Sequence, residues 1–214
     1  MTRYDTRDAA ALPLAFITAY SGIADRAGLR AGQTALVHGG AGGVGHVAVQ
    51  IAVALGATVS ATASARDLDV VAGFGATPID YRQQSVDEYV AACTDGRGFD
   101  LVVDTVGGAT LDASFAAVKH FGHVVSALGW GTHALAPLSF REASYSGVFT
   151  LFPLLSGEQR AHHGEMLREA ARLAEAGKLA PRVDPRRYAL ATAERAYQAM
   201  ADGSARGKLV VDVE

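Results

Sequence analysis

The sequence predicts an α/β protein built on a doubly wound parallel sheet, with a helix–strand segment at its C-terminal end. Three observations predict this fold class. Short runs rich in β-branched residues alternate with segments of helical periodicity along the 214 residues, as in chains whose parallel strands are joined by covering helices. The first of these runs passes into a helix through a glycine-rich stretch at residues 39–45. Half of the residues are hydrophobic and 19% are charged, which allows a large buried core.

The elements follow one another in a regular order. The apolar segment at residues 9–27 predicts a helix or a pair of helices before the sheet. Residues 44–55 carry apolar side chains at the i, i+3, i+4, i+7 spacing of a helix with one buried face. Apolar or β-branched runs predict strands at residues 34–38, 58–62, 77–80, 99–103, 123–128, 148–151 and 208–213. The segments between them predict further helices at residues 68–74, 86–94, 109–118, 159–175 and 193–201.

Composition excludes several classes of protein. Lys and Arg total 19 against 22 Asp and Glu, so the basic excess of a dedicated nucleic-acid binder is missing. No apolar run approaches the roughly 18 to 20 residues that span a bilayer, and the polar start MTRYDTRD lacks the core of a signal peptide. The single cysteine, Cys93, forms neither an internal disulfide nor a cysteine-based zinc site. We therefore expect a cytoplasmic protein with no nucleic-acid or membrane partner.

The glycine-rich stretch fits the pattern G-x-G-x-x-G through Gly40, Gly42 and Gly45. In dinucleotide-binding folds the first glycine makes the tight turn, the second admits the pyrophosphate, and the third lets helix and strand pack closely. The amides and the dipole of the following helix favour a negative charge at this point. The strand–loop–helix–strand context supports this interpretation. The alternative is a turn that only packs the helix on the sheet; a nucleoside-triphosphate loop lacks its G-K-[ST] motif here.

The end of the second predicted strand indicates which dinucleotide binds. NAD-binding chains usually carry Asp or Glu there to hold the ribose 2′-hydroxyl, but no carboxylate precedes Asp67. Ser64 and Arg66 offer instead a hydroxyl and a cation, which suit a 2′-phosphate. The sequence therefore predicts NADPH rather than NADH. The alternative for Arg66 is a solvated residue at the start of a helix.

Six segments in family order resemble the medium-chain dehydrogenase/reductase superfamily, specifically its zinc-free quinone oxidoreductase branch. They are LPLAFITAYSGI (12–23), ALVHGGAGGVGHVAVQIAVALGA (35–57), GATPIDYR (75–82), FDLVVDTVGG (99–108), GHVVSALG (122–129) and GKLVVDV (207–213). The resemblance implies a Rossmann domain with an N-terminal linker helix over residues 1–178. Residues 179–214 are then the remnant of a catalytic GroES-like domain, whose barrel is missing and on which this helix–strand segment normally packs.

The resemblance also implies roles for individual residues. Those expected to hold the adenosine and phosphate end of NADPH are Gly40, Gly42, Gly43, Val44, Gly45, Ser64, Arg66 and Tyr81. Those expected at the ribose and the nicotinamide are Thr105, Val106, Gly107, Leu128, Gly129, Phe149, Thr150 and Thr18. The alternative for Tyr81 is a half-buried aromatic side chain at a strand end. The similar zinc enzymes place a cysteine ligand where this chain has Leu14, so we expect no zinc.

By this resemblance the parent reaction is hydride transfer from NADPH to a quinone or an α,β-unsaturated carbonyl. Because the acceptor is met mainly by the missing domain, we assign no catalytic residue. A homodimer through the sheet edge near residues 147–151 is expected, as in similar enzymes. The alternative function is a non-catalytic module that binds a dinucleotide or docks another subunit. The predicted strand at residues 208–213 has lost its usual sheet partners, and exposed strand edges invite pairing with another chain.

Overall fold

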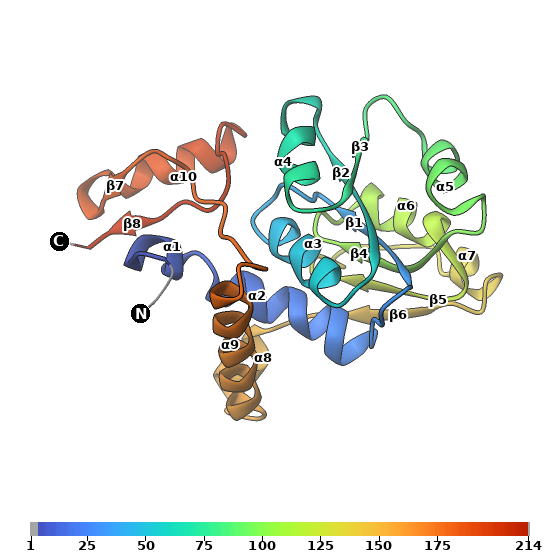
Figure 1. The fold of residues 1–214 in the computed structure, drawn as a ribbon, viewed down its shortest axis with the longest axis horizontal. Coiled ribbons are helices and arrows are strands. Elements are labelled where there is room, and N and C mark those ends of the chain that lie inside the picture. Colours follow the sequence, from blue (N-terminus) through green and yellow to red (C-terminus); the bar gives the residue numbers. More distant parts are fainter. Residues whose placement is uncertain (1–3, 214) are drawn as a thin grey trace.

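The computed structural model describes residues 4–213 and contains a six-stranded parallel sheet flanked by helices (Figure 1). Its strands are β1 (Thr34–His38), β2 (Thr58–Ala63), β3 (Thr77–Asp80), β4 (Phe99–Asp104), β5 (Val118–Ser126) and β6 (Ser144–Gly147). They lie in the order β3-β2-β1-β4-β5-β6. Successive strands are added toward one edge of the sheet from β1 to β3 and toward the other edge from β4 to β6. In doubly wound folds, ligands bind beside the point between β1 and β4 where this order switches. The predicted fold class is confirmed.

Helices cover both faces of this sheet, whereas α1 and α10 lie in the C-terminal part of the molecule (Figure 1). In chain order the helices of the described residues are α1 (Thr6–Ala10), α2 (Pro13–Tyr20), α3 (Gly45–Ala54), α4 (Leu68–Gly73), α5 (Val86–Thr94), α6 (Ala109–Ala117), α7 (Ala136–Ser139), α8 (Leu151–Ser156), α9 (Arg160–Glu175) and α10 (Ala193–Ala201). A π-helical turn, η1 (Ser21–Arg26), extends α2, and short 3-10 turns lie at η2 (Ala65–Asp67) and η3 (Leu190–Thr192).

The central strands β1, β4 and β5 place residues in two separate cores, one on each face of the sheet, which is why they form nearly continuous apolar runs. In β1, Val37 packs with Phe16 of α2 and Ile51 of α3, in a core that also takes in α9. Its neighbour Leu36 faces the other way, toward the core that contains Phe115 of α6. The two cores hold α3 and α6 on opposite faces of the sheet. The carboxyl ends of the strands remain free for the loops that follow them.

The prediction of a sixth strand at residues 148–151 is wrong. The strand is β6, whose His123↔Ser144 to Ser126↔Gly147 pairing places it on the edge of the sheet beside β5. Its sequence SYSG is mostly polar because an edge strand is largely exposed, so it gave no apolar signal. The apolar run that suggested a strand leads instead into α8. The fifth strand also starts five residues earlier than predicted, at Val118, and its pairing with β4 shifts register between Phe99 and Leu101.

The C-terminal residues form a small lobe beside the sheet, next to α1 (Figure 1). Two short parallel strands, β7 (Tyr188–Ala189) and β8 (Val211–Asp212), flank η3 and α10, and Val183 forms an isolated bridge with Lys208. β8 is shorter than the predicted strand at 208–213. The fully buried carboxylate of Asp184 ties the lobe together by accepting hydrogen bonds from the Arg186 side chain and the Arg206 amide. These donors hold the pKa of Asp184 far below its ordinary value.

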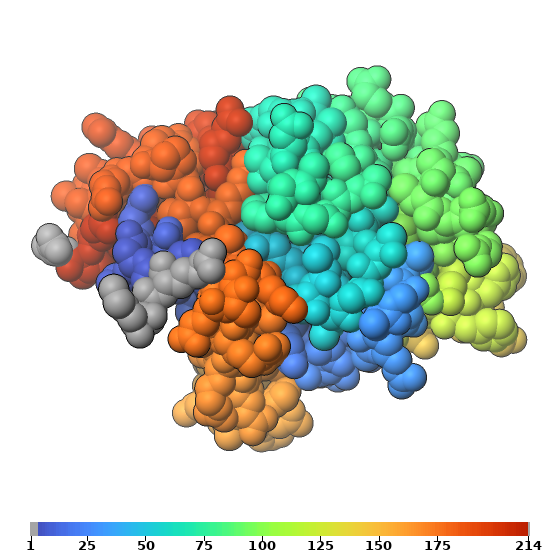
Figure 2. Space-filling model, in the orientation of Figure 1, coloured from blue at the N-terminus to red at the C-terminus, as the bar shows by residue number. Residues whose placement is uncertain are grey.

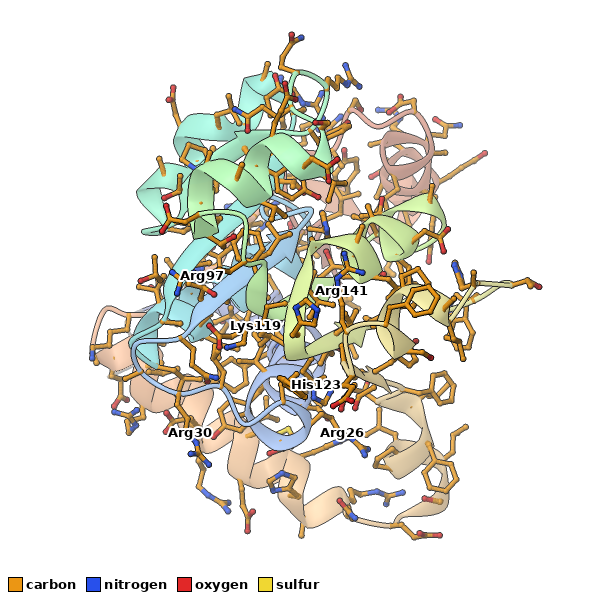
Figure 3. The ribbon with its side chains drawn as sticks, turned by 90° about the vertical axis from the view of Figure 1, so that its right-hand side faces the viewer. Arg26, Arg30, Arg97, Lys119, His123 and Arg141 are labelled. Carbon is orange, nitrogen blue, oxygen red and sulfur yellow. The ribbon has the colours of Figure 1, made fainter. Side chains whose placement is uncertain are left out.

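The amino ends of the strands carry a scattered set of cations, seen in Figure 3. Lys119 at the start of β5 pairs with Asp100, and Arg97 before β4 pairs with Asp95. Arg141 before β6 donates to a carbonyl at the end of α6. These groups lie at the opposite end of the sheet from the glycine-rich loop. No helix in the described part of the chain is both long and apolar enough to cross a membrane.

Candidate functional site

The glycine-rich loop connects β1 to α3 and is shaped by contacts that only glycine permits. Gly39 has a φ of 73°, so the left-handed residue of the turn is Gly39 rather than the predicted Gly40. A Cβ on Gly40 would lie 2.6 Å from the Cβ of Ala61 on β2. A Cβ on Gly45 would strike the Gly39 carbonyl, with its carbon at 2.7 Å. The first and third glycines of the motif therefore allow close packing of the loop on β2 and on itself.

The middle of this loop presents backbone donors at a helix N-terminus. Gly42 donates to the Gly39 carbonyl at 2.8 Å, which tightens the turn. Among the described residues, no hydrogen bond from the amides of Gly43 or Val44 is found. Both residues are half-buried and directly precede α3, which begins at Gly45. Free amides at the start of a helix form an anion-binding cradle, which fits the pyrophosphate of a dinucleotide.

Hydrogen bonds from neighbouring strands fix the start of the loop. The Thr62 hydroxyl on β2 accepts from the Gly39 amide at 3.1 Å, and Thr105 donates to the His38 carbonyl at 2.7 Å. The His38 ring is buried beside Thr62, and burial lowers the pKa of His38 to about 4. Neutral His38 therefore acts as a packed side chain at neutral pH. These bonds join the ends of β1, β2 and β4 into one platform.

The turn after β4 is organised by the buried carboxylate of Asp104. One oxygen of Asp104 accepts from the amides of Val106 at 3.0 Å and Gly107 at 2.9 Å. The other accepts from the Ser126 hydroxyl at 2.7 Å. The same hydroxyl accepts from the Leu128 amide. Asp104 thus fixes the loops after β4 and β5 together, which are the segments expected to meet the ribose and the nicotinamide.

The segment after β2 also gathers around a carboxylate. The Ser64 hydroxyl donates to Asp67 at 3.1 Å, and the Arg66 guanidinium contacts the same oxygen at 3.2 Å. Arg66 donates in addition to the carbonyl of Gly203 in the C-terminal lobe. In Figure 2 the red C-terminal residues lie directly against the blue-green residues of this region. Ser64 and Arg66, the two predicted 2′-phosphate residues, are therefore adjacent and oriented by one acidic group.

Lys208 is a site residue that sequence reasoning missed. A Cβ on Gly43 would lie 3.2 Å from the Lys208 Nζ, so the ammonium group lies over the amides of the glycine-rich loop. The Lys208 side chain is largely desolvated, which lowers the pKa of Lys208. No ion pair of Lys208 is found within residues 4–213. A cation without a partner beside an amide cradle suits an anion. Only its presence in the GKLVVDV motif marked it in the sequence.

The remaining predicted residues lie along the carboxyl edge of the sheet or near it. Gly107 approaches Leu128 so closely that a Cβ on it would lie 2.6 Å from the Leu128 carbonyl oxygen. Gly129 packs against the Tyr145 hydroxyl. The exposed Phe149 ring contacts Trp130 at 6.0 Å between centroids, and Thr150 is the residue before α8.

Tyr81 and Thr18 are not drawn into the platform. The Tyr81 ring follows β3, is 52% exposed, and lies under the Arg82 guanidinium. It is therefore more exposed than the half-buried aromatic that formed the alternative. The Thr18 hydroxyl on α2 donates to the carbonyl of Leu14 at 2.8 Å. The predicted contacts of Tyr81 with the adenosine phosphate and of Thr18 with the nicotinamide stay predictions.

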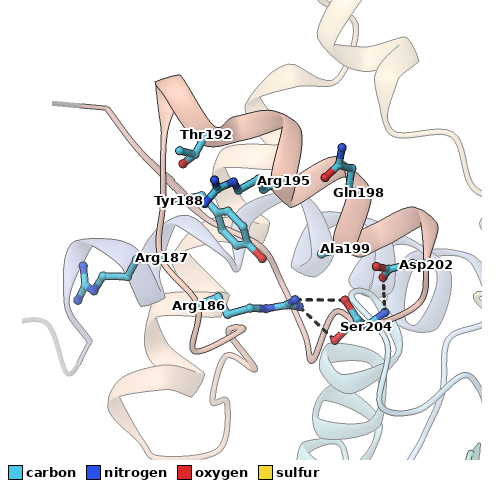
Figure 4. A pocket seen from close by; sticks show the side chains of 9 residues that line it. All are labelled: Arg186, Arg187, Tyr188, Thr192, Arg195, Gln198, Ala199, Asp202 and Ser204. Atoms are coloured by element: carbon cyan, nitrogen blue, oxygen red, sulfur yellow. Dashed lines mark hydrogen bonds between the residues drawn. The ribbon is translucent and has the colours of Figure 1, made fainter.

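Metal-ligand groups and a hollow in the C-terminal lobe are the two alternatives to this platform. Among residues 4–213, no group of three or more His, Cys, Asp or Glu is placed to hold a metal ion, and Leu14 offers no ligand atom. An open hollow of about 600 Å³ lies in the C-terminal lobe between Arg186, Tyr188 and Arg195 (Figure 4). Arg186 is already engaged there by Ser204 and Asp184, and the hollow lies away from the glycine-rich loop.

Comparison with known proteins identifies the family. The model of the zinc-binding dehydrogenase family matches residues 74–211, which is well over half of the chain. The chain belongs to this family. Its structural neighbours place it, as the sequence suggested, in the medium-chain dehydrogenase/reductase superfamily. The family name refers to zinc, whereas the described residues of this member provide no metal-binding cluster.

Two solved structures and one curated protein are similar to nearly the whole of this chain. An alcohol dehydrogenase superfamily protein from Novosphingobium aromaticivorans has a TM-score of 0.96 and 57% identity, over 99% of this chain and 65% of that one. The CurK enoyl reductase has a TM-score of 0.85 and 27% identity, over 99% and 64%. The spectinabilin polyketide synthase system protein NorB of Streptomyces orinoci is 36% identical over 95% of this chain and 9% of its own length.

The family supports a general NAD(P)-dependent oxidoreductase role for the chain. The chain spans less than two thirds of the Novosphingobium protein and less than a tenth of NorB. The activities of those whole proteins therefore reach this chain only as proposals.

Proposed function

We propose that this chain binds NADPH and orients it for hydride transfer to an α,β-unsaturated carbonyl or a quinone. The observation that supports the proposal most directly is the ammonium of Lys208, which forms no ion pair among residues 4–213 and lies over the amides of the glycine-rich loop. The Lys208 ammonium supplies a positive charge for the pyrophosphate, and the amides at the N-terminus of α3 supply hydrogen-bond donors. Ser64 and Arg66 supply the hydroxyl and the cation for a 2′-phosphate.

Each part of the platform has one task in this function. The glycine-rich loop binds the phosphates, and the turn held by Asp104 positions the ribose. The Ser126 hydroxyl accepts from the Leu128 amide and so fixes the segment of Leu128 and Gly129. This segment positions the nicotinamide ring at the end of β5. NADPH, when bound, supplies the hydride; the protein contributes orientation and an environment for the charge that develops on the acceptor. We assign no proton donor among the described residues.

The class of acceptor is inferred from the relatives. An enoyl group is an α,β-unsaturated acyl group, and CurK is an enoyl reductase similar to nearly the whole of this chain. This favours the unsaturated carbonyl over the quinone within the proposal. The use of NADPH together with the single cysteine, Cys93, fits a reducing compartment such as the cytoplasm.

Calorimetric titration with NADPH and NADH tests the cofactor proposal. We expect Arg66→Ala to weaken NADPH binding by about tenfold or more and to leave NADH binding unchanged, because only NADPH carries the 2′-phosphate. We expect Lys208→Gln to weaken both cofactors by a similar factor, because both carry the pyrophosphate. A wild-type chain that binds neither cofactor would overturn the proposal. Equal loss of NADH in Arg66→Ala would remove the 2′-phosphate role of Arg66.

We also propose that two copies associate through the β6 edge. The strand leaves one row of backbone groups unpaired, and apolar side chains next to it are exposed: Trp130, Phe149, Phe152 and Leu155. An exposed edge with an apolar border is a template for pairing with another chain. The proposed seam is β6 at residues 144–147 together with α8, which replaces the predicted strand at 148–151.

Sedimentation equilibrium tests this association. The wild-type chain is expected at twice its monomer mass at micromolar concentration, and the double variant Phe152→Asp/Leu155→Asp at the monomer mass. Leu190→Asp, which places the same charge on an exposed leucine of the C-terminal lobe, is the matched control and should stay dimeric. A wild-type monomer, or a dimer that survives the double variant, would contradict the proposal.

A further inference from the structure

Asp67 is the first carboxylate after β2, yet its charge is enclosed on several sides. Its side chain is 10% exposed. Ser64 and Arg66 contact one oxygen, and the Arg182 guanidinium donates to the other at 2.6 Å. Of the two cations, Arg182 lies nearer to the Asp67 carboxylate, at 2.6 Å against 3.2 Å for Arg66. It is also more buried, because its side chain is 14% exposed and that of Arg66 is 49% exposed.

Arg182 comes from the C-terminal segment, far away in sequence, and it is anchored at three places. One guanidinium nitrogen donates to the Ala41 carbonyl in the glycine-rich loop at 2.6 Å. Another donates to Asp67. Its backbone amide donates to the His46 ring on α3 at 3.1 Å. The side chain therefore joins the glycine-rich loop to the segment after β2, in a fixed position.

The charge of this cluster decides what it attracts. A free carboxylate at the end of β2 hydrogen-bonds a ribose 2′-hydroxyl and repels a 2′-phosphate. With Arg182 in place, two guanidinium groups face one carboxylate and the cluster carries a net positive charge. Without Arg182, Asp67 would neutralise Arg66, and the phosphate would meet no net positive charge. A group that touches no cofactor can thus set the selectivity through Asp67.

We propose that Arg182 is a specificity-determining residue: it neutralises Asp67 and so leaves Arg66 and Ser64 free to favour NADPH over NADH. The inference rests on the proposed function, because it assigns a basis for cofactor choice at the same site. It adds a positioning residue outside the β1–α3–β2 unit. The C-terminal lobe is then part of the cofactor site.

The test uses adenosine fragments, which report on the 2′-phosphate without any reaction. Binding of 2′,5′-ADP and of 5′-AMP to the 214-residue chain is measured by calorimetry, and the affinity ratio is compared between variants. Arg182→Gln is expected to lower the preference for 2′,5′-ADP by about tenfold, since one charge beside the phosphate is lost. Arg182→Gln/Asp67→Asn is expected to restore the wild-type ratio, because the uncompensated carboxylate is removed as well.

The controls separate selectivity from folding. Arg172→Gln breaks an exposed Arg–Glu pair on α9 and should leave the ratio unchanged. A purely structural role of Arg182 would weaken both fragments equally, so an unchanged ratio in Arg182→Gln overturns the inference. If Arg182→Gln does not fold, Asp67→Asn and the double variant decide. A ratio above wild type in Asp67→Asn together with the wild-type ratio in the double variant supports the inference, and an unchanged ratio in Asp67→Asn contradicts it. Absence of binding by the wild-type chain would overturn the proposed function and this inference together.

Discussion

Gly45→Ala is expected to abolish dinucleotide binding and to destabilise the fold. The added Cβ would strike the Gly39 carbonyl, whose carbon would lie at 2.7 Å, and the Cα of Gly40 at 3.1 Å. Both obstacles are backbone atoms, so no side chain can move aside. The loop must shift away from α3, and the amide cradle is lost. Overpacking of this kind costs about 1 to 3 kcal/mol or more.

Gly164→Ala is the matched control for this substitution. Gly164 lies within α9, where a Cβ would meet no heavy atom nearer than 3.9 Å. Alanine there should stabilise the protein by about 0.5 to 1 kcal/mol, because it favours the helix. Thermal unfolding and calorimetry with NADPH measure both effects. A Gly45→Ala chain with wild-type stability and affinity would show that the loop adopts another conformation in solution.

Asp104→Ala is expected to have the second largest effect, on stability and on ribose binding together. The substitution leaves the amides of Val106 and Gly107 and the Ser126 hydroxyl without their acceptor. Buried groups deprived of a partner cost about 1 to 3 kcal/mol each. We therefore expect a loss of at least about 2 kcal/mol in the free energy of unfolding. The turn after β4 would also lose its fixed geometry.

Chemical denaturation measures the loss in stability, and NADPH titration measures the loss in affinity. Asp87→Ala, at an exposed position in the first turn of α5, is the control and should change stability by about 0.5 kcal/mol or less. An Asp104→Ala chain that keeps both stability and affinity would mean that water satisfies these donors. The Asp104 network would then have no organising role.

Most of the fold could be predicted because its signals are local. β1, β3, α5 and α10 have the predicted bounds, since each is a periodic or β-branched run ended by polar or glycine residues. β6 could not be found in this way, because an edge strand buries too little surface to require apolar residues. The apolar run after it was misread because exposed apolar residues in a helix resemble a buried strand when only composition is considered.

The residues of the candidate site likewise fall into those that local sequence could predict and those that it could not. The glycine-rich loop, Ser64 and Arg66 were visible because they lie within one strand–helix–strand unit. The role of Asp104 is not apparent from its neighbours in the sequence, because its four hydrogen bonds depend on the packing of β4 against β5. The distinction between Gly39 and Gly40 in the turn also required backbone angles.

The sequence by itself determined the parallel sheet, the glycine-rich loop and the class of cofactor that this loop suits. Each follows from the order and spacing of neighbouring residues. Tertiary structure decided which charges surround that loop. Arg182 reaches Asp67 across 115 positions of the chain, and Lys208 reaches Gly43 from near the C-terminal end of the sequence. No local pattern encodes such approaches, because they arise only when the C-terminal lobe packs against the carboxyl edge of the sheet.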